Sequence, residues 1–223
     1  MKVRNLVIAS LAVLAAMVGF ALYAAGLAPA GAELPTHWNA RGEVDGTMPA
    51  LQALLMPAGL LAFVTLVFAV IPRIEPLQDR LEASAPLLRA TWIAMLGFMA
   101  FLQGLIAAPL FGYAPAGHLA LLPAGVLLVV LGNMLPKSRP GFFVGIRTPW
   151  TIVDEDVWIA THRLGGKLML LAGVLFILTA VLPVEPALRG WIIGIGIAVS
   201  VVVPIGYSWW LWNAKHRSGR RTD

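Results

Sequence analysis

Six long apolar stretches constrain this chain more than any other feature of its sequence. None of them contains Asp, Glu or Arg, and a helix of about 20 mainly apolar residues is long enough to cross a bilayer. With 59% hydrophobic and 12% charged residues, the chain is too apolar for a soluble or a disordered protein. We therefore predict an all-α integral membrane protein, a single domain over residues 1–223 with six transmembrane helices. The predicted spans are Leu6–Leu27, Ala50–Ile71, Ala90–Leu110, Leu119–Leu135, Gly166–Leu182 and Gly190–Trp212.

The first stretch also has features of a signal peptide, since a basic segment precedes it and small residues follow it. Its apolar run is longer than the roughly 7–15 residues of a signal-peptide core. We therefore interpret it as a retained first span.

The basic residues predict the orientation of the helices. If the N-terminus is cytoplasmic, 14 of the 16 Lys and Arg residues lie on the inner side, and only Arg41 and Arg189 lie outside. This asymmetry follows the positive-inside rule. We predict that both termini are cytoplasmic, and that the net charge of +5 reflects topology rather than direct binding of nucleic acid. The basic tail Lys215–Arg221 can also contact anionic lipid.

Most tryptophans are expected to anchor the protein in the membrane interface. Seven of the eight fall near predicted span ends or in the inner connection, which is typical of interfacial anchoring. These seven are Trp92, Trp150, Trp158, Trp191, Trp209, Trp210 and Trp212.

Two connections are long, Ala28–Pro49 outside and Pro136–Gly165 inside, and long connections in compact proteins tend to carry function. In the outer one, His37, Trp38 and Asn39 can meet an extracellular peptide or an envelope component. The alternative interpretation is a turn built by Asn39 and Gly42, with Trp38 resting on the lipid headgroups.

The inner connection contains a well-signalled helix start. Thr148 with Pro149, or Thr151 with Asp154, has the pattern of an N-terminal cap. Acidic residues in the first turns complement the helix dipole, and apolar residues then recur at helical spacing. We predict an interfacial amphipathic helix between spans four and five.

Both connections resemble segments of a known family. The inner one reads Gly132-Asn-x-x-Pro-Lys, Phe143-x-Gly-Ile-Arg-Thr-Pro-Trp-Thr, Val157-Trp and Thr161-His-Arg-x-Gly-Gly-Lys167, and it resembles the SdpI family signature. The outer one, Leu34-Pro-Thr-His-Trp-Asn-Ala-Arg-Gly42, resembles a short segment that often precedes this signature. The similar segments are 10–58, the first span with the His-Trp-Asn loop, and 119–195. One departure is Val153 before Asp154, where relatives commonly have small hydroxyl residues.

The resemblance marks candidate functional positions in both connections, each of which can bind a partner or serve a structural role. The inner positions are Asn133, Pro136, Lys137, Gly145, Arg147, Thr148, Pro149, Trp150, Trp158, His162, Arg163 and Gly166. The outer positions are Pro35, His37, Trp38, Asn39 and Gly42. In particular, the segment Arg147–Trp150 can bind a partner or an anionic lipid headgroup, or it can simply orient the surface helix.

The resemblance also implies a function. It implies a multi-pass protein of the bacterial cytoplasmic (inner) membrane that binds or neutralises a secreted antimicrobial, toxin-like peptide. In signalling, the toxin-occupied protein would recruit a transcriptional repressor to the membrane.

The alternative function is a small multi-pass transporter or channel. Coupled carriers normally place ionisable residues inside their spans, and the most polar residue deep in a span here is Gln103. We expect Gln103 to bond to another helix. We predict no enzyme, because no nucleophile with a base is visible, and no cofactor. His162 with Glu155 offers too few ligands for a metal site, and His37, Glu43 and Asp45 would bind a cation only weakly, so we predict no metal site.

Overall fold

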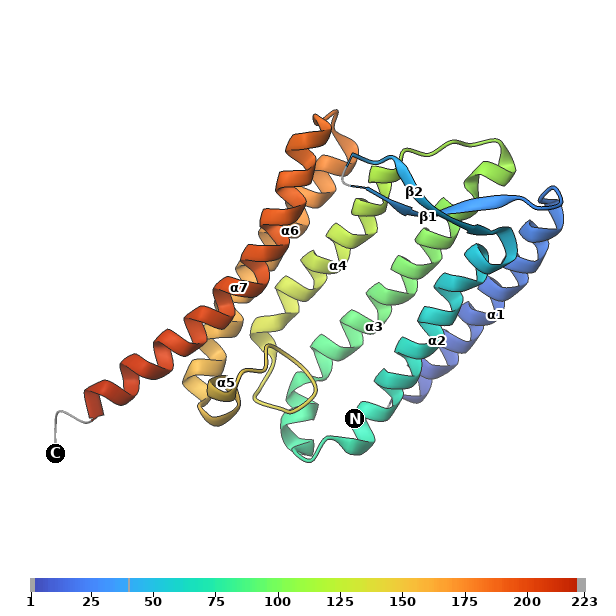
Figure 1. The fold of residues 1–223 in the computed structure, drawn as a ribbon. Coiled ribbons are helices and arrows are strands. Elements are labelled where there is room, and N and C mark those ends of the chain that lie inside the picture. The colour runs from blue at the N-terminus through green and yellow to red at the C-terminus, as the bar shows by residue number, and fades with distance from the viewer. Residues whose placement is uncertain (1–2, 40, 220–223) are drawn as a thin grey trace.

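The chain forms a bundle of long helices with a small β-hairpin across one end (Figure 1). The computed structural model describes residues 3–39 and 41–219, and within these ranges six helical segments are long and apolar enough to cross a membrane. The prediction of a six-span α-helical membrane protein is confirmed. In chain order the elements are α1 (Arg4–Leu27), β1 (Glu33–Trp38), β2 (Val44–Pro49), α2 (Ala50–Ile74), α3 (Gln78–Ala107), η1 (Ala108–Phe111), η2 (Gly117–Ala120), α4 (Leu121–Met134), η3 (Leu135–Lys137), α5 (Pro149–Val153), α6 (Glu155–Val181) and α7 (Pro186–Gly219).

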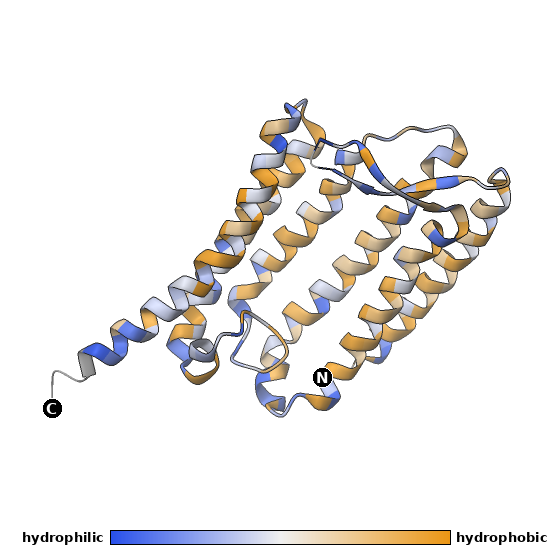
Figure 2. Cartoon of the chain, viewed as in Figure 1, coloured by the Kyte–Doolittle hydropathy of each residue, from blue (hydrophilic) through white to orange (hydrophobic). Residues whose placement is uncertain are grey.

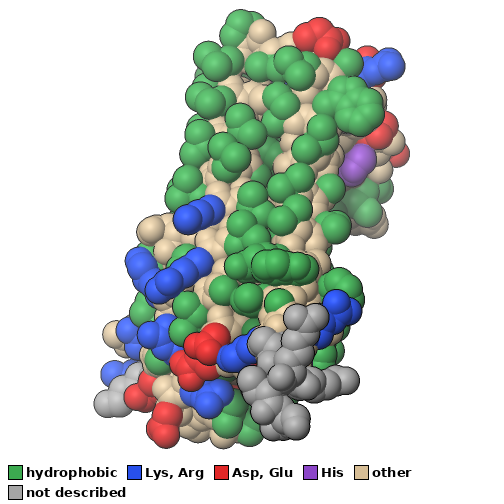
Figure 3. All heavy atoms as spheres, turned by 90° about the vertical axis from the view of Figure 1, so that its left-hand side faces the viewer, with side chains coloured by type: hydrophobic (Ala, Val, Ile, Leu, Met, Phe, Trp, Pro, Cys, Tyr) green, Lys and Arg blue, Asp and Glu red, His purple; other side chains and the backbone are tan. Residues whose placement is uncertain are grey.

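The two ends of the bundle differ in charge. Apolar residues dominate the spans, and polar residues gather toward their ends (Figure 2). On the face shown in Figure 3, most Lys and Arg side chains lie toward the end from which α7 projects. The start of α1 and the end of α7 both lie at this end, as an even number of spans requires (Figure 1). We term it the inner end, after the predicted orientation; Lys2, Arg220 and Arg221, which contributed to that prediction, lie outside the described residues.

The prediction of a separate interfacial helix between spans four and five is wrong. The helix-start signals are real, but α5 has only five residues, and α6 runs without a break from Glu155 through the fifth span to Val181. In the first turns of α6, Val157, Trp158 and His162 are fully buried. The apolar face of this segment is therefore covered by protein rather than by lipid.

Helices α1, α2 and α3 form one group that buried hydrogen bonds hold together. The side-chain amide of Gln103 on α3 donates to the carbonyl oxygens of Met17 on α1, at 2.8 Å, and Leu54 on α2, at 2.9 Å. The indole of Trp92 donates to the hydroxyl of Ser10, at 2.8 Å. Because lipid offers no competing partner, such bonds act as polar links between helices.

Two tryptophans are not interfacial anchors. Trp92 and Trp158 are both 0% exposed, and their indole N–H groups donate to protein oxygens, so the prediction for them is wrong. Trp191, Trp209 and Trp210 are between 49% and 70% exposed, which is compatible with anchoring.

Helices α4, α6 and α7 form the second group, and glycines let α4 and α6 approach closely. A Cβ added at Gly132 would lie 2.6 Å from the carbonyl oxygen of Gly166, and one added at Gly125 would lie 2.6 Å from that of Gly173. Likewise, a Cβ added at Gly166 would lie 2.6 Å from the carbonyl oxygen of Gly132, and one added at Gly173 would lie 2.6 Å from that of Gly125. Small residues at such positions permit tight packing where the hydrophobic effect does not drive helices together.

The outer connection is a hairpin that crosses from the first group to the second (Figure 1). Strand β1 pairs antiparallel with β2, from Glu33 opposite Pro49 to Trp38 opposite Val44. The hairpin tip rests on η2, because a Cβ added at Gly117 would collide with the Trp38 ring and with the carbonyl oxygen of Gly42. The predicted turn is thus present, but within a hairpin that the prediction did not include.

We expect Gly132→Ala to destabilise the protein. Its Cβ would overlap the α6 backbone, so the helices must separate, at a cost of about 1–3 kcal/mol in the free energy of unfolding. Thermal unfolding of the purified protein in detergent measures this loss. Gly97→Ala is the matched control, since its Cβ would meet no atom within 4 Å. Equal melting temperatures for the two variants would contradict the close α4–α6 contact.

We expect the hairpin and the inner end to face opposite compartments. The chain has no cysteine, so single substitutions give clean reporters. An impermeant maleimide should label His37→Cys only in right-side-out vesicles and Lys137→Cys only in inverted vesicles, because both positions are exposed. Labelling of both variants from one side would overturn the predicted topology.

Candidate functional site

The inner loop, residues 138–148, lies at the inner end and makes hydrogen bonds to both helix groups. It has little regular structure, so its backbone polar groups need partners from elsewhere in the protein. Five side chains from outside the loop supply most of these partners: Glu75, Ser84, Thr151, Trp158 and His162.

Glu75 ties the end of α2 to the loop. It follows the last residue of α2 and is only 3% exposed. Its carboxylate accepts hydrogen bonds from the backbone N–H groups of Phe142 at 3.1 Å, Phe143 at 3.2 Å and Leu77 at 3.2 Å. Three such donors compensate for burying the charge. Glu75 is not among the predicted positions; its only signal in the sequence is that it lies just after the second apolar span.

Ser84 of α3 makes a second link to the same loop. Its hydroxyl accepts from the backbone N–H of Arg139 at 2.9 Å and donates to the Arg139 carbonyl oxygen at 3.3 Å. Neighbouring Ser138 is bonded instead to the second group, because the indole of Trp158 donates to its carbonyl oxygen at 3.3 Å. Two adjacent loop residues thus join opposite helix groups.

Trp158 and His162 form a buried stack on α6. Their rings lie 4.0 Å apart, centroid to centroid, and both residues are 0% exposed. The Nε2 atom of His162 accepts from the backbone N–H of Ile146 at 2.8 Å, so the ring proton is on Nδ1 and is donated to the Trp158 carbonyl oxygen, also at 2.8 Å. One ring nitrogen of His162 therefore bonds to the loop, and the other bonds to the backbone of its own helix.

Gly145 fits against this stack because it has no side chain. A Cβ there would lie 2.5 Å from His162 Nε2 and 2.7 Å from the Trp158 ring. Its φ of +118° is also strained for any other residue. Three predicted positions, Gly145, Trp158 and His162, are thus brought together into one structural cluster.

The end of the loop is attached to α7. Thr148 and Thr151 form a capping box: the N–H of Thr151 donates to Thr148 Oγ1 at 3.2 Å, and the N–H of Thr148 donates to Thr151 Oγ1 at 2.9 Å. The Thr148 hydroxyl also lies 3.1 Å from the hydroxyl of Ser208 on α7. Pro149 occupies the first position of α5, as predicted, and Trp150 is half-buried.

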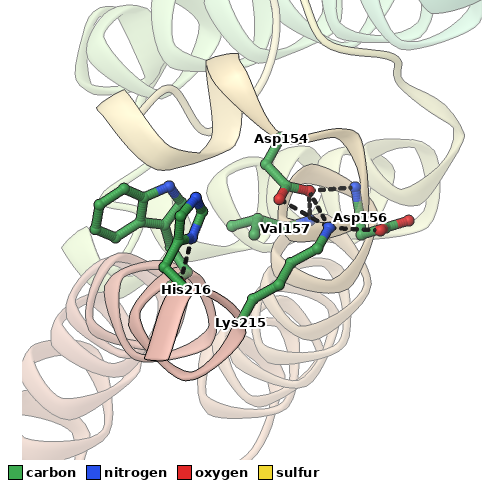
Figure 4. A network of polar contacts seen from close by, with 6 residues as sticks. Asp154, Asp156, Val157, Lys215 and His216 are labelled. Atoms are coloured by element: carbon green, nitrogen blue, oxygen red, sulfur yellow. Dashed lines mark hydrogen bonds and ion pairs between the residues drawn. The ribbon is translucent and has the colours of Figure 1, made fainter. Parts of the chain in front are cut away.

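An ion-pair cluster joins the start of α6 to the end of α7 (Figure 4). Lys215 lies 2.8 Å from one oxygen of Asp154 and 2.7 Å from Asp156. Asp154 also caps α6 by accepting from the N–H groups of Asp156 and Val157. Burial would raise the pKa of Asp154, but the hydrogen bonds from Lys215 and from these backbone groups outweigh it and lower that pKa below its usual value.

Other predicted inner positions lie apart from this cluster. Asn133, Lys137 and Arg163 are exposed. Pro136 packs under Gly166 in the α4–α6 contact. Arg147 is exposed as well, but its guanidinium donates to the Phe142 carbonyl oxygen at 2.6 Å.

At the outer end, Asn39 organises the hairpin tip. Its side-chain oxygen accepts from the N–H groups of Arg41 at 2.9 Å and Glu43 at 3.1 Å, and its amide donates to the Glu43 carboxylate at 2.8 Å. Gly42 has a φ of +84°, which favours glycine.

The remaining outer positions differ in exposure. The His37 side chain is 71% exposed, and its Nδ1 lies 2.6 Å from Asp45. Trp38 packs partly into the first group, and Pro35, on β1, is half-buried. Within residues 3–39 and 41–219, no group of three His, Asp or Glu side chains is placed to hold a metal ion.

Segments that include the two long connections match known protein families. Residues 137–208 match the SdpI/YfhL protein family, and residues 11–62 match a domain of unknown function, DUF1648. Immunity protein SdpI of Bacillus subtilis (strain 168) is 35% identical over 52 residues, which is 23% of this chain and 25% of that protein. The match therefore spans a quarter of the length of this relative. No solved structure matches the chain.

We expect Glu75→Gln to loosen the inner loop. The amide keeps one acceptor oxygen but loses the charge, so the hydrogen bonds to Phe142 and Phe143 weaken by about 1–3 kcal/mol in total. Hydrogen exchange of these two backbone amides should become about ten-fold faster or more, since 1.4 kcal/mol is a factor of ten. Glu155→Gln is the control, because Glu155 is exposed. Unchanged exchange in Glu75→Gln would show that Glu75 does not hold the loop.

Proposed function

From the match of residues 137–208 to the SdpI/YfhL protein family, we propose that the chain is a membrane immunity protein of this family that binds an antimicrobial peptide at its outer hairpin. The observation that carries the proposal is the placement of the two motif-bearing connections. Each crosses between the two helix groups, the hairpin at the outer end and the inner loop at the other. Each is therefore placed to sense or set how the groups pack.

The outer hairpin offers a surface suited to an amphipathic peptide. His37 and Asp45 present a polar pair, while Val44 and Met48 on β2 are 51% and 38% exposed. Among the described residues β1 and β2 pair only with each other, and a bound peptide would add a further strand to this sheet. Peptide backbone would supply affinity and the exposed side chains would supply selectivity.

The inner loop would transmit the binding of a peptide at the outer hairpin to a cytoplasmic partner. A ligand that binds better to one arrangement of the two groups shifts the protein toward it. Because Glu75 and Ser84 hold the loop on one group while Trp158 and Ser208 hold it on the other, the loop changes shape when the groups move. The exposed side chains of Asn133, Lys137 and Arg163 would then present a surface that recruits a transcriptional repressor.

The transporter alternative has less support. Gln103, the polar residue singled out within the spans, is only 3% exposed, and its amide N–H groups donate to two backbone carbonyls. A group bound in this way holds helices together and is not available to line a pathway. Binding also needs neither a cofactor nor catalytic groups, so we propose a non-enzymatic role.

We expect His37→Ala to weaken protection against the peptide without lowering membrane abundance. The side chain is exposed, so the fold tolerates its loss, whereas removal of an interface anchor typically costs 1–2 kcal/mol of binding energy. A deletion strain carrying this variant should be killed at roughly ten-fold lower peptide concentration than one carrying the wild type. The measurement is survival in a challenge with candidate secreted peptides.

Lys137→Ala is the matched control at the opposite end of the bundle. It should leave survival unchanged and reduce only the membrane recruitment of the repressor. If the wild-type gene gives no protection against any candidate peptide, immunity is rejected. Substrate uptake by vesicles containing the purified protein would instead favour transport.

A further inference from the structure

The inner loop closes one end of an apolar cavity between the two helix groups. The cavity has a volume of about 240 Å³, and it is lined by side chains of α2, α3, α4 and α6 and by Phe143–Ile146 of the loop. Thr91 is its one hydroxyl-bearing side chain, and that hydroxyl donates to the carbonyl oxygen of Leu87 at 2.8 Å. The lining side chains therefore offer no unpaired polar group to a ligand.

Such a cavity favours an apolar occupant over water. A protein cavity of about 150 Å³ lined only by apolar groups stays dry and binds small hydrocarbons. This one is larger and partly open, and the helices that line it are all membrane spans. Lipid acyl chains surround membrane spans, so they are the apolar groups available to such a cavity.

The same loop carries a positively charged side chain, Arg147, that is hydrogen-bonded to the loop backbone. Arg147 donates to the Phe142 carbonyl oxygen at 2.6 Å, and this bond closes a ring around the four residues that line the cavity, Phe143–Ile146. One of five guanidinium N–H groups makes this bond, and no ion pair among the described residues involves Arg147. The guanidinium is thus pre-oriented and able to bind phosphate.

Glu75, an acidic side chain that contacts this loop, does not compete with a phosphate for Arg147. Glu75 is buried, and its carboxylate is compensated by the N–H groups of Phe142, Phe143 and Leu77. The inner end also carries most of the basic residues of the chain. Basic pockets between spans on the cytoplasmic side are suited to anionic lipid headgroups.

We propose that this cavity is a binding site for one anionic phospholipid, with an acyl chain between the two helix groups and the phosphate on Arg147. The lipid would fill the space between the groups directly behind the inner loop. The proposal stands apart from peptide immunity, because it concerns the inner end alone and needs no toxin.

Native mass spectrometry of the purified full-length protein tests the site. The protein is mixed in detergent with equal amounts of dioleoyl phosphatidylglycerol and dioleoyl phosphatidylcholine. The wild type should retain one phosphatidylglycerol molecule with about five-fold preference, as one Arg contributes about 1 kcal/mol toward an anionic headgroup. Arg147→Gln should abolish that preference, and Arg217→Gln, at an exposed position on α7, should not.

The acyl-chain part of the proposal is tested by filling the cavity. Met169→Trp, at a lining position on α6, should reduce retention of both lipids, whereas Leu171→Trp, at a position that is 56% exposed, should not. Leu131→Phe is the milder variant to use if Met169→Trp unfolds. Wild-type protein that retains no lipid, or a filled cavity that retains as much as the wild type, would overturn the site. A preference that survives Arg147→Gln would overturn the assigned headgroup contact.

Discussion

Backbone without regular structure at the edge of a bilayer must find its hydrogen-bond partners within the protein, and the structure depends on how the inner loop meets this requirement. Glu75 supplies a buried carboxylate for two loop amides, and His162 supplies a ring nitrogen for a third. Without these acceptors the partly buried N–H groups would lose their partners, which costs more than an ordinary hydrogen bond contributes. The loop is therefore an integral part of the bundle.

Different contacts hold the helices together within each of the two groups. Buried polar contacts of Gln103 and Trp92 link α1, α2 and α3, whereas glycine-mediated backbone contact joins α4 to α6. Between the groups, α3 packs against α4, and both connections add further contacts: Trp38 of the hairpin rests on Gly117, and the inner loop bonds to both groups. Relative movement of the groups would act on both connections at once, which is the physical basis of the signalling role we propose.

The inner loop also links the two proposals. Its polar contacts join it to both helix groups, while Phe143–Ile146 line the apolar cavity. A lipid bound there would contact the loop and the helices of both groups. Occupancy of the cavity is thus one factor, besides an outer ligand, that would bias the packing of the groups.

The sequence by itself determined the parts of this protein that depend on local composition. Six runs of apolar residues predict six spans because lipid requires them, and Thr148 with Pro149 predicts a helix start because a cap acts within one turn. Only the tertiary structure decided which distant groups meet. That Glu75 binds the inner loop, that Trp158 is buried rather than interfacial, and that α6 continues through its predicted amphipathic segment all depend on which helices pack together. Residue spacing reports the faces of one helix, but a polar group finds its partner only when the other helices have taken their places.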